Sequence, residues 1–443
     1  MHWTNSKGMF ILFGLLRGYF LMPHFIFKFA SSLGLVLLVS LAGAQDIAEE
    51  LYSRYESSVY RVEVVTPGVE NKASVGTGFV IGRNDILASN FHVISNVVNE
   101  PDRYRLEWEG VDGRRGPLTV LAVDVVHDLA ILQAEEPMGL PMQIADLPEN
   151  GVSLFSLGHP LALDLAIVSG TNNGLQDSSL YEKVLFSGNI NPGMSGGPAL
   201  DRFGQVVGIN VATSGEAVGY LVPATYLEEL LADARATNFR PEADLATSIS
   251  NQLADNQQSL VDEILNNEWR NISLGKLSIP GQVLDRLDCW SDNQFEEGTN
   301  RYTVNASVCQ GQNSIYLSEQ LRAGAFSYEF YWLDSEQLSP SAFYQIYQRS
   351  SRSRFPSRPS EEDVGNFTCS TRFLILSEQD FKANICARPY LDYPDLTDFM
   401  VLMTMVGHDT EGVIFIMDFS TVSLENGLAV LEKFLGALEW NPS

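Results

Sequence analysis

The chain has 443 residues, of which 45% are hydrophobic and 19% are charged, with 55 Asp and Glu against 28 Lys and Arg. That length is enough for about two or three domains. A net charge of −27 argues against a protein that coats nucleic acid or anionic lipid, because both depend on Lys and Arg contacts. We therefore expect no nucleic-acid partner.

The N-terminal region carries two short apolar stretches, residues 9–22 and 33–44. Neither has the run of about 20 apolar residues that a membrane helix needs. The second follows Lys28 and ends in small residues, which is typical of a cleavable secretory signal. We predict a signal peptide over residues 1–44, periplasmic or secreted localisation and no membrane span after cleavage. An uncleaved anchor is the alternative, and Met22 lies where a signal would begin if residues 1–21 came from an upstream start codon.

After a predicted amphipathic helix at residues 46–57, the pattern changes to many short β-type runs separated by Gly, Asn, Asp and Pro. These runs extend from Val59 to Val222, and a helix over Tyr226 to Ala234 follows them. Short strands at regular spacing are typical of a β-barrel or sandwich. We therefore predict an all-β domain over residues 45–238.

Three segments of this region carry candidate catalytic residues: His92 after a strand, Asp128 before another, and Ser195 in a glycine-rich turn. A Ser hydroxyl is a weak nucleophile that needs an imidazole to take its proton, and a carboxylate orients that imidazole. Gly193 lets the backbone curl, so that its own N–H and that of Ser195 can converge on a developing oxyanion. Gly196 and Gly197 are expected to leave room for substrate. Together the three segments indicate a nucleophile, a base and an orienting acid.

The same residues resemble the trypsin-like serine peptidases of the chymotrypsin fold, and among them the bacterial HtrA-type branch. The resemblance lies in seven motifs in family order: Gly76-Thr77-Gly78-Phe79-Val80-Ile81, Asn90-Phe91-His92-Val93-Ile94, Asp128-Leu129-Ala130, Leu157-Gly158-His159-Pro160, Gly193-Met194-Ser195-Gly196-Gly197-Pro198, Gly208-Ile209-Asn210 and Gly219-Tyr220-Leu221-Val222-Pro223. It implies a double β-barrel, with His92 as general base, Asp128 as its orienting acid, Ser195 as nucleophile, and the Gly193 and Ser195 amides as oxyanion hole. His127 and His159 are expected to be surface or turn residues.

Two departures from the digestive branch bear on activation and specificity. Met194 stands where an Asp would pair with a freshly cleaved N-terminus, so activation by clipping is not expected. Asn189 stands where an acid would bind a Lys or Arg side chain, which disfavours cleavage after basic residues. We predict an apolar residue before the scissile bond, with the substrate backbone added to the strand at Ile209 to Val211. The predicted substrate-binding residues are Asn189, Ile190, Ile209, Asn210, Val211 and Ala212.

The C-terminal half shows no PDZ-type carboxylate-binding loop that the resemblance would lead one to expect. A helical linker is predicted over residues 239–268, followed by a smaller α+β domain over 269–443 made of two loosely similar halves. All four cysteines lie in this domain, and short loops favour the pairs Cys289 with Cys309 and Cys369 with Cys386. Zinc is the disfavoured alternative, because no C-x-x-C spacing occurs.

The sequence as a whole predicts an exported serine endopeptidase that acts on proteins or peptides through an acyl-enzyme, without a cofactor or a metal. A non-catalytic binding or chaperone-like module built on a protease scaffold is the alternative. The oligomeric state, the natural substrate and the role of the C-terminal domain are left open by the sequence.

Overall fold

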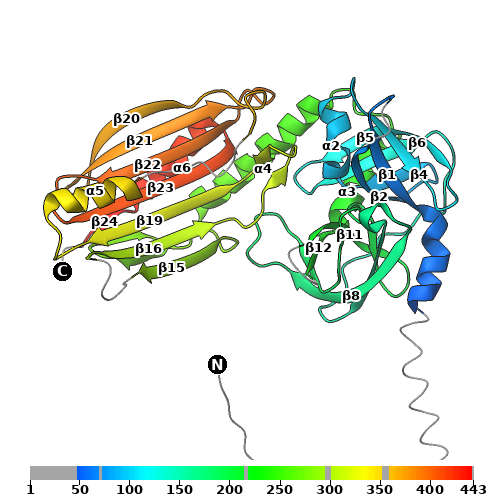
Figure 1. Cartoon of the computed structure of the whole chain (residues 1–443), viewed down its shortest axis with the longest axis horizontal. Coiled ribbons are helices and arrows are strands. Elements are labelled where there is room, and N and C mark those ends of the chain that lie inside the picture. Colours follow the sequence, from blue (N-terminus) through cyan, green and yellow to red (C-terminus); the bar gives the residue numbers. More distant parts are fainter. Residues whose placement is uncertain (1–46, 69–71, 214–217, 295–300, 352–358, 442–443) are drawn as a thin grey trace, which may run out of the picture. The chain divides into compact units, whose positions relative to one another are not determined.

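Figure 1 shows the computed structural model of the chain, which describes residues 47–68, 72–213, 218–294, 301–351 and 359–441. The predicted signal peptide, residues 1–44, lies outside the described residues. The first described residues, 47–55, are helical, and a short 3-10 turn η1 (Glu56–Ser58) follows them. Within the described ranges, no helix is both long enough and apolar enough to cross a membrane.

The first strands form a closed antiparallel barrel in the order β1-β2-β3-β6-β5-β4. Alternating side chains fill its interior, as on the inner face of any small barrel. Its strands are β1 (Val59–Val65), β2 (Lys72–Val80), β3 (Ile86–Ser89), β4 (Arg105–Glu109), β5 (Arg115–Asp124) and β6 (Leu129–Ala134). A helix that the sequence did not reveal, α2 (Phe91–Asn99), begins directly after β3 and buries Phe91 and Ile94. His92 therefore lies in the first turn of a helix.

A second closed barrel has the order β10-β11-β12-β9-β8-β7. Its strands are β7 (Ser153–Gly158), β8 (Ala166–Leu175), β9 (Val184–Phe186), β10 (Pro198–Leu200), β11 (Val206–Thr213) and β12 (Gly219–Pro223), with the 3-10 turn η2 (Pro160–Ala162) between β7 and β8. Helix α3 (Ala224–Ala236) follows and packs on both barrels. The two barrels confirm the predicted chymotrypsin-like double barrel.

Helix α4 (Leu245–Asn266) leads from the barrels into the C-terminal domain. Asp244 caps its start, because the carboxylate accepts from the N–H of Thr247 at 3.0 Å. Its apolar stripe, which includes Ile249 and Leu253, is buried. The helix contacts both β5 of the first barrel and the C-terminal sheet. Gln252 extends this contact by donating to the carbonyl of Val123.

The C-terminal domain is built on a seven-stranded antiparallel sheet in the order β15-β16-β19-β23-β22-β21-β20. Its strands are β15 (Asp288–Gln294), β16 (Thr303–Gln310), β19 (Phe326–Asp334), β20 (Thr368–Leu376), β21 (Gln379–Pro389), β22 (Thr397–Met405) and β23 (Glu411–Val422). Smaller sheets pair β13 (Asn271–Leu274), β14 (Leu277–Pro280) and β24 (Glu439–Trp440), and β17 (Ile315–Tyr316) with β18 (Arg322–Ala323).

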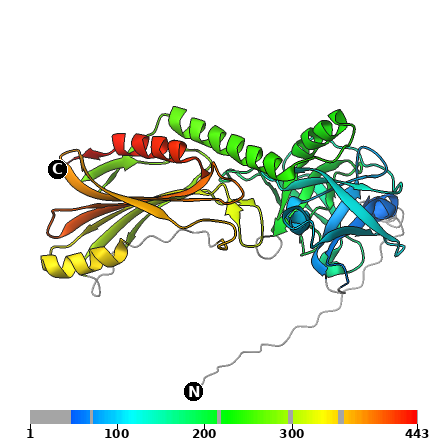
Figure 2. The ribbon, with the colours of Figure 1, turned by 90° about the horizontal axis from the view of Figure 1, so that it is seen from above.

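Helices cover both faces of this sheet, and alternate residues of β23 contact opposite layers. Figure 2 shows α4 and α6 (Leu424–Gly436) on one face and α5 (Pro340–Ser350) on the other. Phe415 belongs to the cluster that contains Phe434 of α6, whereas Ile414 packs with Phe343 of α5. The domain is α+β, as predicted.

Disulfides staple the two outer hairpins of the sheet. Cys289 of β15 faces Cys309 of β16 and is bonded to it, and Cys369 of β20 is bonded in the same way to Cys386 of β21. The cysteines are thus used for disulfides, as expected for an oxidising compartment. Because both hairpins are edges of one continuous sheet, the two halves share a core. Their duplication stays a prediction.

Candidate active site

His92 and Asp128 meet beside the first barrel. The Nδ1–H of His92 donates to Oδ2 of Asp128 at 2.6 Å, and the backbone N–H of His92 donates to Oδ1 of the same carboxylate at 2.8 Å. A carboxylate accepts but does not donate, so this contact leaves the Nε2 lone pair of His92 free to take a proton. The carboxylate also lies at the N-terminus of α2, where a negative charge is favoured.

Asp128 holds this position in a backbone conformation that is unusual for a residue other than glycine. Its φ is 61°, in the left-handed region, and its side chain is almost fully buried. The carbonyl of Asp128 accepts from the side-chain amide of Asn90 at 2.7 Å and from the N–H of Phe91 at 3.2 Å. Asn90 is itself fully buried, so an uncharged side chain fixes the acid's backbone.

Ser195 is half-buried in the turn before β10, and its hydroxyl donates to the carbonyl of Val211 at 3.0 Å. Among the described residues, no hydrogen bond joins Ser195 Oγ to His92. The structure therefore unites two of the three predicted triad side chains and directs the third to a neighbouring strand. Rotation about one side-chain bond redirects a hydroxyl of this kind within picoseconds to nanoseconds.

The backbone around Ser195 is arranged so that two amides remain free. In the described part of the chain, neither the N–H of Gly193 nor that of Ser195 donates a hydrogen bond. Gly193 has a φ of 94°, as expected for the turn, and the carbonyl of Pro192 before it accepts from the N–H of Leu161 at 2.6 Å. The Pro192 carbonyl is thus engaged with the turn that follows β7.

The structure gives a different reason from the expected one for glycine at the two positions after Ser195. A Cβ on Gly196 would lie 2.2 Å from the carbonyl oxygen of Thr77, and one on Gly197 would lie 2.1 Å from that of Leu157. These contacts are with the protein's own strands, so the two glycines allow close approach of backbone rather than entry of substrate.

Asn210 is predicted to bind substrate as part of the strand whose backbone would pair with it, and its side chain has structural contacts of its own. It is fully buried, donates to the carbonyls of Leu157 and Met194, and accepts from the hydroxyl of Ser156. Its backbone also exchanges hydrogen bonds with Gly196 and Gly197. Asn210 therefore braces the turn that carries Ser195.

Comparison with known proteins gives a consistent picture for this part of the chain. Residues 76–209 match the family described as "Trypsin-like peptidase domain". The matched part of the chain is therefore a trypsin-like peptidase domain. Serine protease HTR4 of Rattus norvegicus is 25% identical over 45% of this chain and 44% of its own length. Serine protease HTRA2, mitochondrial, of Drosophila virilis is 31% identical over 37% of this chain and 40% of its own length.

Putative serine protease HhoA of a Synechocystis strain is 28% identical over 44% of this chain and 51% of its own length. The chain thus spans only about half the length of these curated relatives, or less. A solved structure titled "Crystal structure of Deg5" covers 43% of this chain and 95% of its own, with 22% identity and a TM-score of 0.38.

Thr77 of the peptidase domain is a supporting residue to which the sequence assigned no role beyond its place in a motif. It is fully buried, its hydroxyl donates to the carbonyl of Gly193 at 2.7 Å, and it accepts from the N–H of His159 at 3.0 Å. Its backbone N–H donates to the carbonyl of Ser195 at 2.8 Å. Two contacts from one residue of β2 thus hold both ends of the turn that contains the two free amides, and a third joins that residue to His159.

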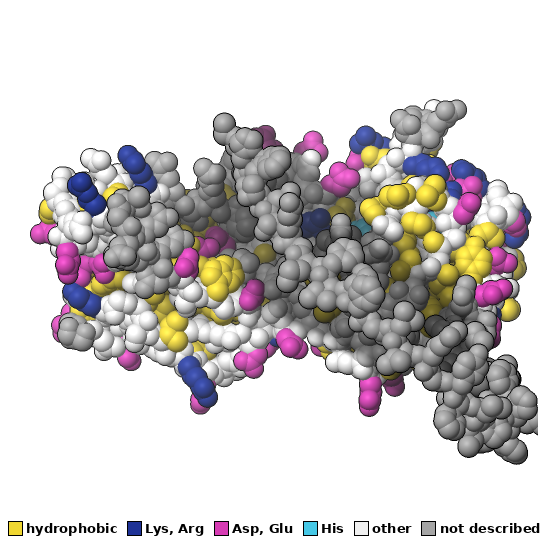
Figure 3. All heavy atoms as spheres, turned by 60° about the horizontal axis from the view of Figure 1, so that its bottom comes forward, with side chains coloured by type: hydrophobic (Ala, Val, Ile, Leu, Met, Phe, Trp, Pro, Cys, Tyr) yellow, Lys and Arg dark blue, Asp and Glu magenta, His cyan; other side chains and the backbone are white. Residues whose placement is uncertain are grey.

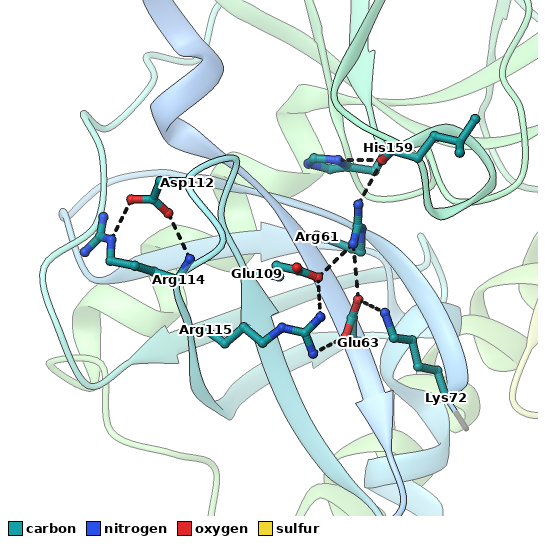
Figure 4. Close-up of polar contacts among 9 residues, drawn as sticks. Arg61, Glu63, Lys72, Glu109, Asp112, Arg114, Arg115 and His159 are labelled. Atoms are coloured by element: carbon teal, nitrogen blue, oxygen red, sulfur yellow. Dashed lines mark hydrogen bonds and ion pairs between the residues drawn. The ribbon is translucent and has the colours of Figure 1, made fainter. Parts of the chain in front are cut away.

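A charged cluster on the first barrel contacts the turn that contains His159. Figure 4 shows Arg61 between the carboxylates of Glu63 and Glu109 and the turn of His159. Arg61 donates to the carbonyl of Leu163 at 3.0 Å, and His159 Nδ1 lies 3.3 Å from the same oxygen. Burial lowers the pKa of His159, and the charge of Arg61 acts in the same direction. His159 lies in a turn, as expected, but is buried.

The predicted specificity residues of the peptidase domain fall into two groups. Ile190 and Ile209 are buried, and Ile190 packs against Gly219, where an added Cβ would meet its side chain at 2.7 Å. Asn189 is exposed and Val211 is half-buried. The side chain of Ala212 lies outside the described part of the structure.

Met194 and His127 both have structural surroundings. Met194 is fully buried in the core of the second barrel, which leaves no acid to receive a new N-terminus at that position. His127 bonds to Asp124 at 2.7 Å and stacks on Tyr226. Among the residues that the structure describes, no group of His, Cys, Asp and Glu is arranged to hold a metal ion.

Proposed function

We propose that this chain is an exported serine endopeptidase that hydrolyses peptide bonds through a Ser195 acyl-enzyme. The observation that carries the proposal is the double contact of the Asp128 carboxylate with His92, which orients the imidazole and leaves its Nε2 free. An imidazole held in this orientation can take the proton of a hydroxyl nucleophile and so activate it. The free amides of Gly193 and Ser195 support the same assignment.

In this mechanism the Ser195 hydroxyl leaves the Val211 carbonyl and donates to Nε2 of His92. As Oγ attacks the carbonyl carbon of the substrate, His92 takes the proton and Asp128 stabilises the imidazolium. The oxyanion is stabilised by the amides of Gly193 and Ser195, and loss of one such donor typically costs about 10²–10³ in turnover. His92 then gives its proton to the departing amine, and a water molecule hydrolyses the ester by the same route.

Substrate binding itself offers a reason for the hydroxyl to move. In the proposed mode the substrate backbone adds to the edge of β11, where the Val211 carbonyl is a hydrogen-bond acceptor. A substrate N–H that takes this acceptor displaces the Ser195 hydroxyl toward His92. We retain the preference for an apolar residue before the scissile bond, since Ile190 is apolar and Asn189 carries no charge.

A non-catalytic scaffold is the second candidate, and one observation favours it: the Ser195 hydroxyl is bonded to Val211 rather than to His92. A fluorophosphonate probe separates the two, because it reacts only with a serine whose hydroxyl is activated. We expect the full chain to be labelled at Ser195 and the Ser195→Ala variant not to be labelled.

Ser153→Ala is the matched control, because Ser153 is an exposed serine on β7 away from the turn. It should be labelled as fast as the wild type. A folded wild-type chain that takes up no probe and cleaves no peptide would rule out the peptidase and leave the scaffold.

A further inference from the structure

A cavity of about 390 Å³ lies beside His92 and Asp128, and part of its wall comes from the C-terminal domain. The peptidase domain contributes Lys183, Val211 and Tyr220 to the lining, among other residues. The opposite wall is residues 312–316 and Arg322, which belong to the hairpin of β17 and β18. We call residues 312–323 the cleft hairpin. More than 180 residues of sequence separate it from His92.

The cleft hairpin is fixed to the peptidase domain by hydrogen bonds. Asn99 of α2 donates to the carbonyl of Leu317 at 3.1 Å, and the side chain of Asn313 donates to the hydroxyl of Ser179 at 2.5 Å. Next to the hairpin, the buried hydroxyl of Tyr181 donates to the carbonyl of Gly324 at 2.9 Å. These contacts make the hairpin a built wall of the cavity.

Two contacts of the Tyr316 ring link the cleft hairpin to His92, the candidate general base. The ring of Tyr316 meets the imidazole of His92 edge to face, with centroids 5.8 Å apart. The guanidinium of Arg322 lies over the Tyr316 ring, 4.3 Å from its centroid. A side chain entering this cavity would therefore contact an aromatic ring next to His92 and a cation beyond it.

The cavity is cationic although the chain is strongly acidic. Among the described residues, neither Lys183 nor Arg322 has a carboxylate within ion-pair distance, and Lys183 is half-buried. The acids near Lys183 are bound elsewhere, Asp128 to His92 and Asp124 to His127. Figure 3 shows acidic side chains spread over the face that it draws.

Burial also makes a charged Lys183 costly. It lowers the pKa of the ammonium group, and the charges of Asp128 and Asp124 only oppose that shift. A carboxylate that entered the cavity would supply the missing partner.

We propose that the cleft hairpin and Lys183 form a subsite for an acidic substrate side chain, next to the residue at the scissile bond. This inference rests on the proposed function. Neither Ser195 nor Ile190 is among the lining residues that the structure describes, so the cavity is not the pocket for the residue at the scissile bond itself. Val211 does line the cavity, so the cavity lies along β11, the strand that the acyl part of the substrate would join. The preferred substrate thus has Asp or Glu immediately before an apolar residue.

Three internally quenched peptides test this subsite in the full chain. In all three, the residue immediately before the scissile bond is a mixture of Ala, Val, Leu and Ile. The residue before that one is Asp, Asn or Lys and is the only difference between the peptides. The wild type should cleave the Asp peptide with a kcat/KM about fivefold above that of the Asn peptide, as expected for a partly exposed ion pair, and should cleave the Lys peptide more slowly still. Arg322→Glu and Lys183→Gln should each remove the preference for Asp over Asn.

Arg372→Glu is the control, because it makes the same charge change on an exposed residue of β20, an edge strand of the seven-stranded sheet to which the cleft hairpin does not belong. It should keep the wild-type preference. Equal cleavage of the three peptides by a wild type that fluorophosphonate labels would overturn the subsite and leave the peptidase. An equal rise in cleavage of all three in Arg322→Glu would show that the hairpin obstructs the cleft, and would overturn it too. If the wild type is neither labelled by the fluorophosphonate nor able to cleave any of the peptides, the proposed function itself is wrong and the subsite falls with it.

Discussion

The side chains that hold the candidate site in shape are mostly uncharged and buried, and each forms hydrogen bonds with another segment of the chain. Asn90 binds the backbone of Asp128, and Thr77 joins the turn of Ser195 to the segment of His159. The side chain of Asn210 joins the same turn, at the Met194 carbonyl, to two residues of β7. Neutral groups of this kind position a backbone without adding a charge that would compete with the reacting ones. Leaving one partner unpaired in a buried site costs about 1–3 kcal/mol.

Thr77→Val tests this role of positioning because it removes the hydroxyl and keeps the shape. The Gly193 carbonyl and the His159 N–H then lose their partner, so the turn that carries the two free amides becomes less ordered. We expect the free energy of unfolding to fall by about 1–2 kcal/mol and kcat to fall roughly tenfold with little change in KM. Peptide kinetics and urea unfolding measure the two effects. Thr77→Ser keeps the hydroxyl and should restore kcat; a serine variant as slow as the valine variant would assign the effect to the lost methyl group.

At the scale of elements, strand β23 buries a carboxyl group, one oxygen of which has no hydrogen-bond partner among the described residues. Asp418 is 8% exposed, its Oδ1 has no hydrogen-bond partner, and the carboxylates of Glu329 and Asp398 are near. Asp398 is satisfied by Arg388 and Tyr390. Burial, aided by the two acids, raises the pKa of Asp418 to about 7. The folded sheet therefore favours the protonated acid.

This predicts stability that declines with rising pH. An unfolded Asp has a pKa near 3.9, so the folded state binds the proton more tightly, and its contribution is complete below about pH 4 and lost as the pH approaches 7. The loss is at most about 4 kcal/mol. Asp418→Asn should reduce the slope of the unfolding free energy between pH 4 and 7, measured by urea titration. The exposed Asp262→Asn should keep the wild-type slope; an unchanged slope in Asp418→Asn would mean that Asp418 is ionised throughout.

Local sequence patterns predict the barrels well, because each strand has its own apolar run and turn residues. They predict less where a helix is short: α2 lies directly after β3, and α5 shows only Ser339 as N-cap and Pro340 in its first turn as signals. The contact of Tyr316 with His92 has no local signal at all. The same holds for Thr77, whose partners are backbone groups far along the chain. Such pairings depend on the tertiary arrangement.

At the scale of the whole described chain, one hydrophobic cluster continues from the first barrel through α4 into the C-terminal sheet. It includes Val62, Ile249 and Phe415, and also Leu180 and Tyr181 next to the cleft hairpin. Because the core is continuous from Glu50 onward, we expect the peptidase barrels and the C-terminal domain to unfold in one transition.

Gly324→Ala tests this coupling at the contact with Tyr181. A Cβ at Gly324 would lie 1.9 Å from the Tyr181 hydroxyl, and its φ of 70° is already unfavourable for alanine. Gly113→Ala is the matched control, since Gly113 has a φ of 77° and nothing within 4 Å of the added Cβ. The control should cost about 1 kcal/mol of unfolding free energy, and Gly324→Ala roughly 1–3 kcal/mol more, because its contact must be forced apart. In calorimetry of the full chain, the unfolding transition of Gly324→Ala should be broader than that of the wild type or split in two, and that of Gly113→Ala should not. Equal losses in the two variants would mean that the contact at Tyr181 does not couple the domains.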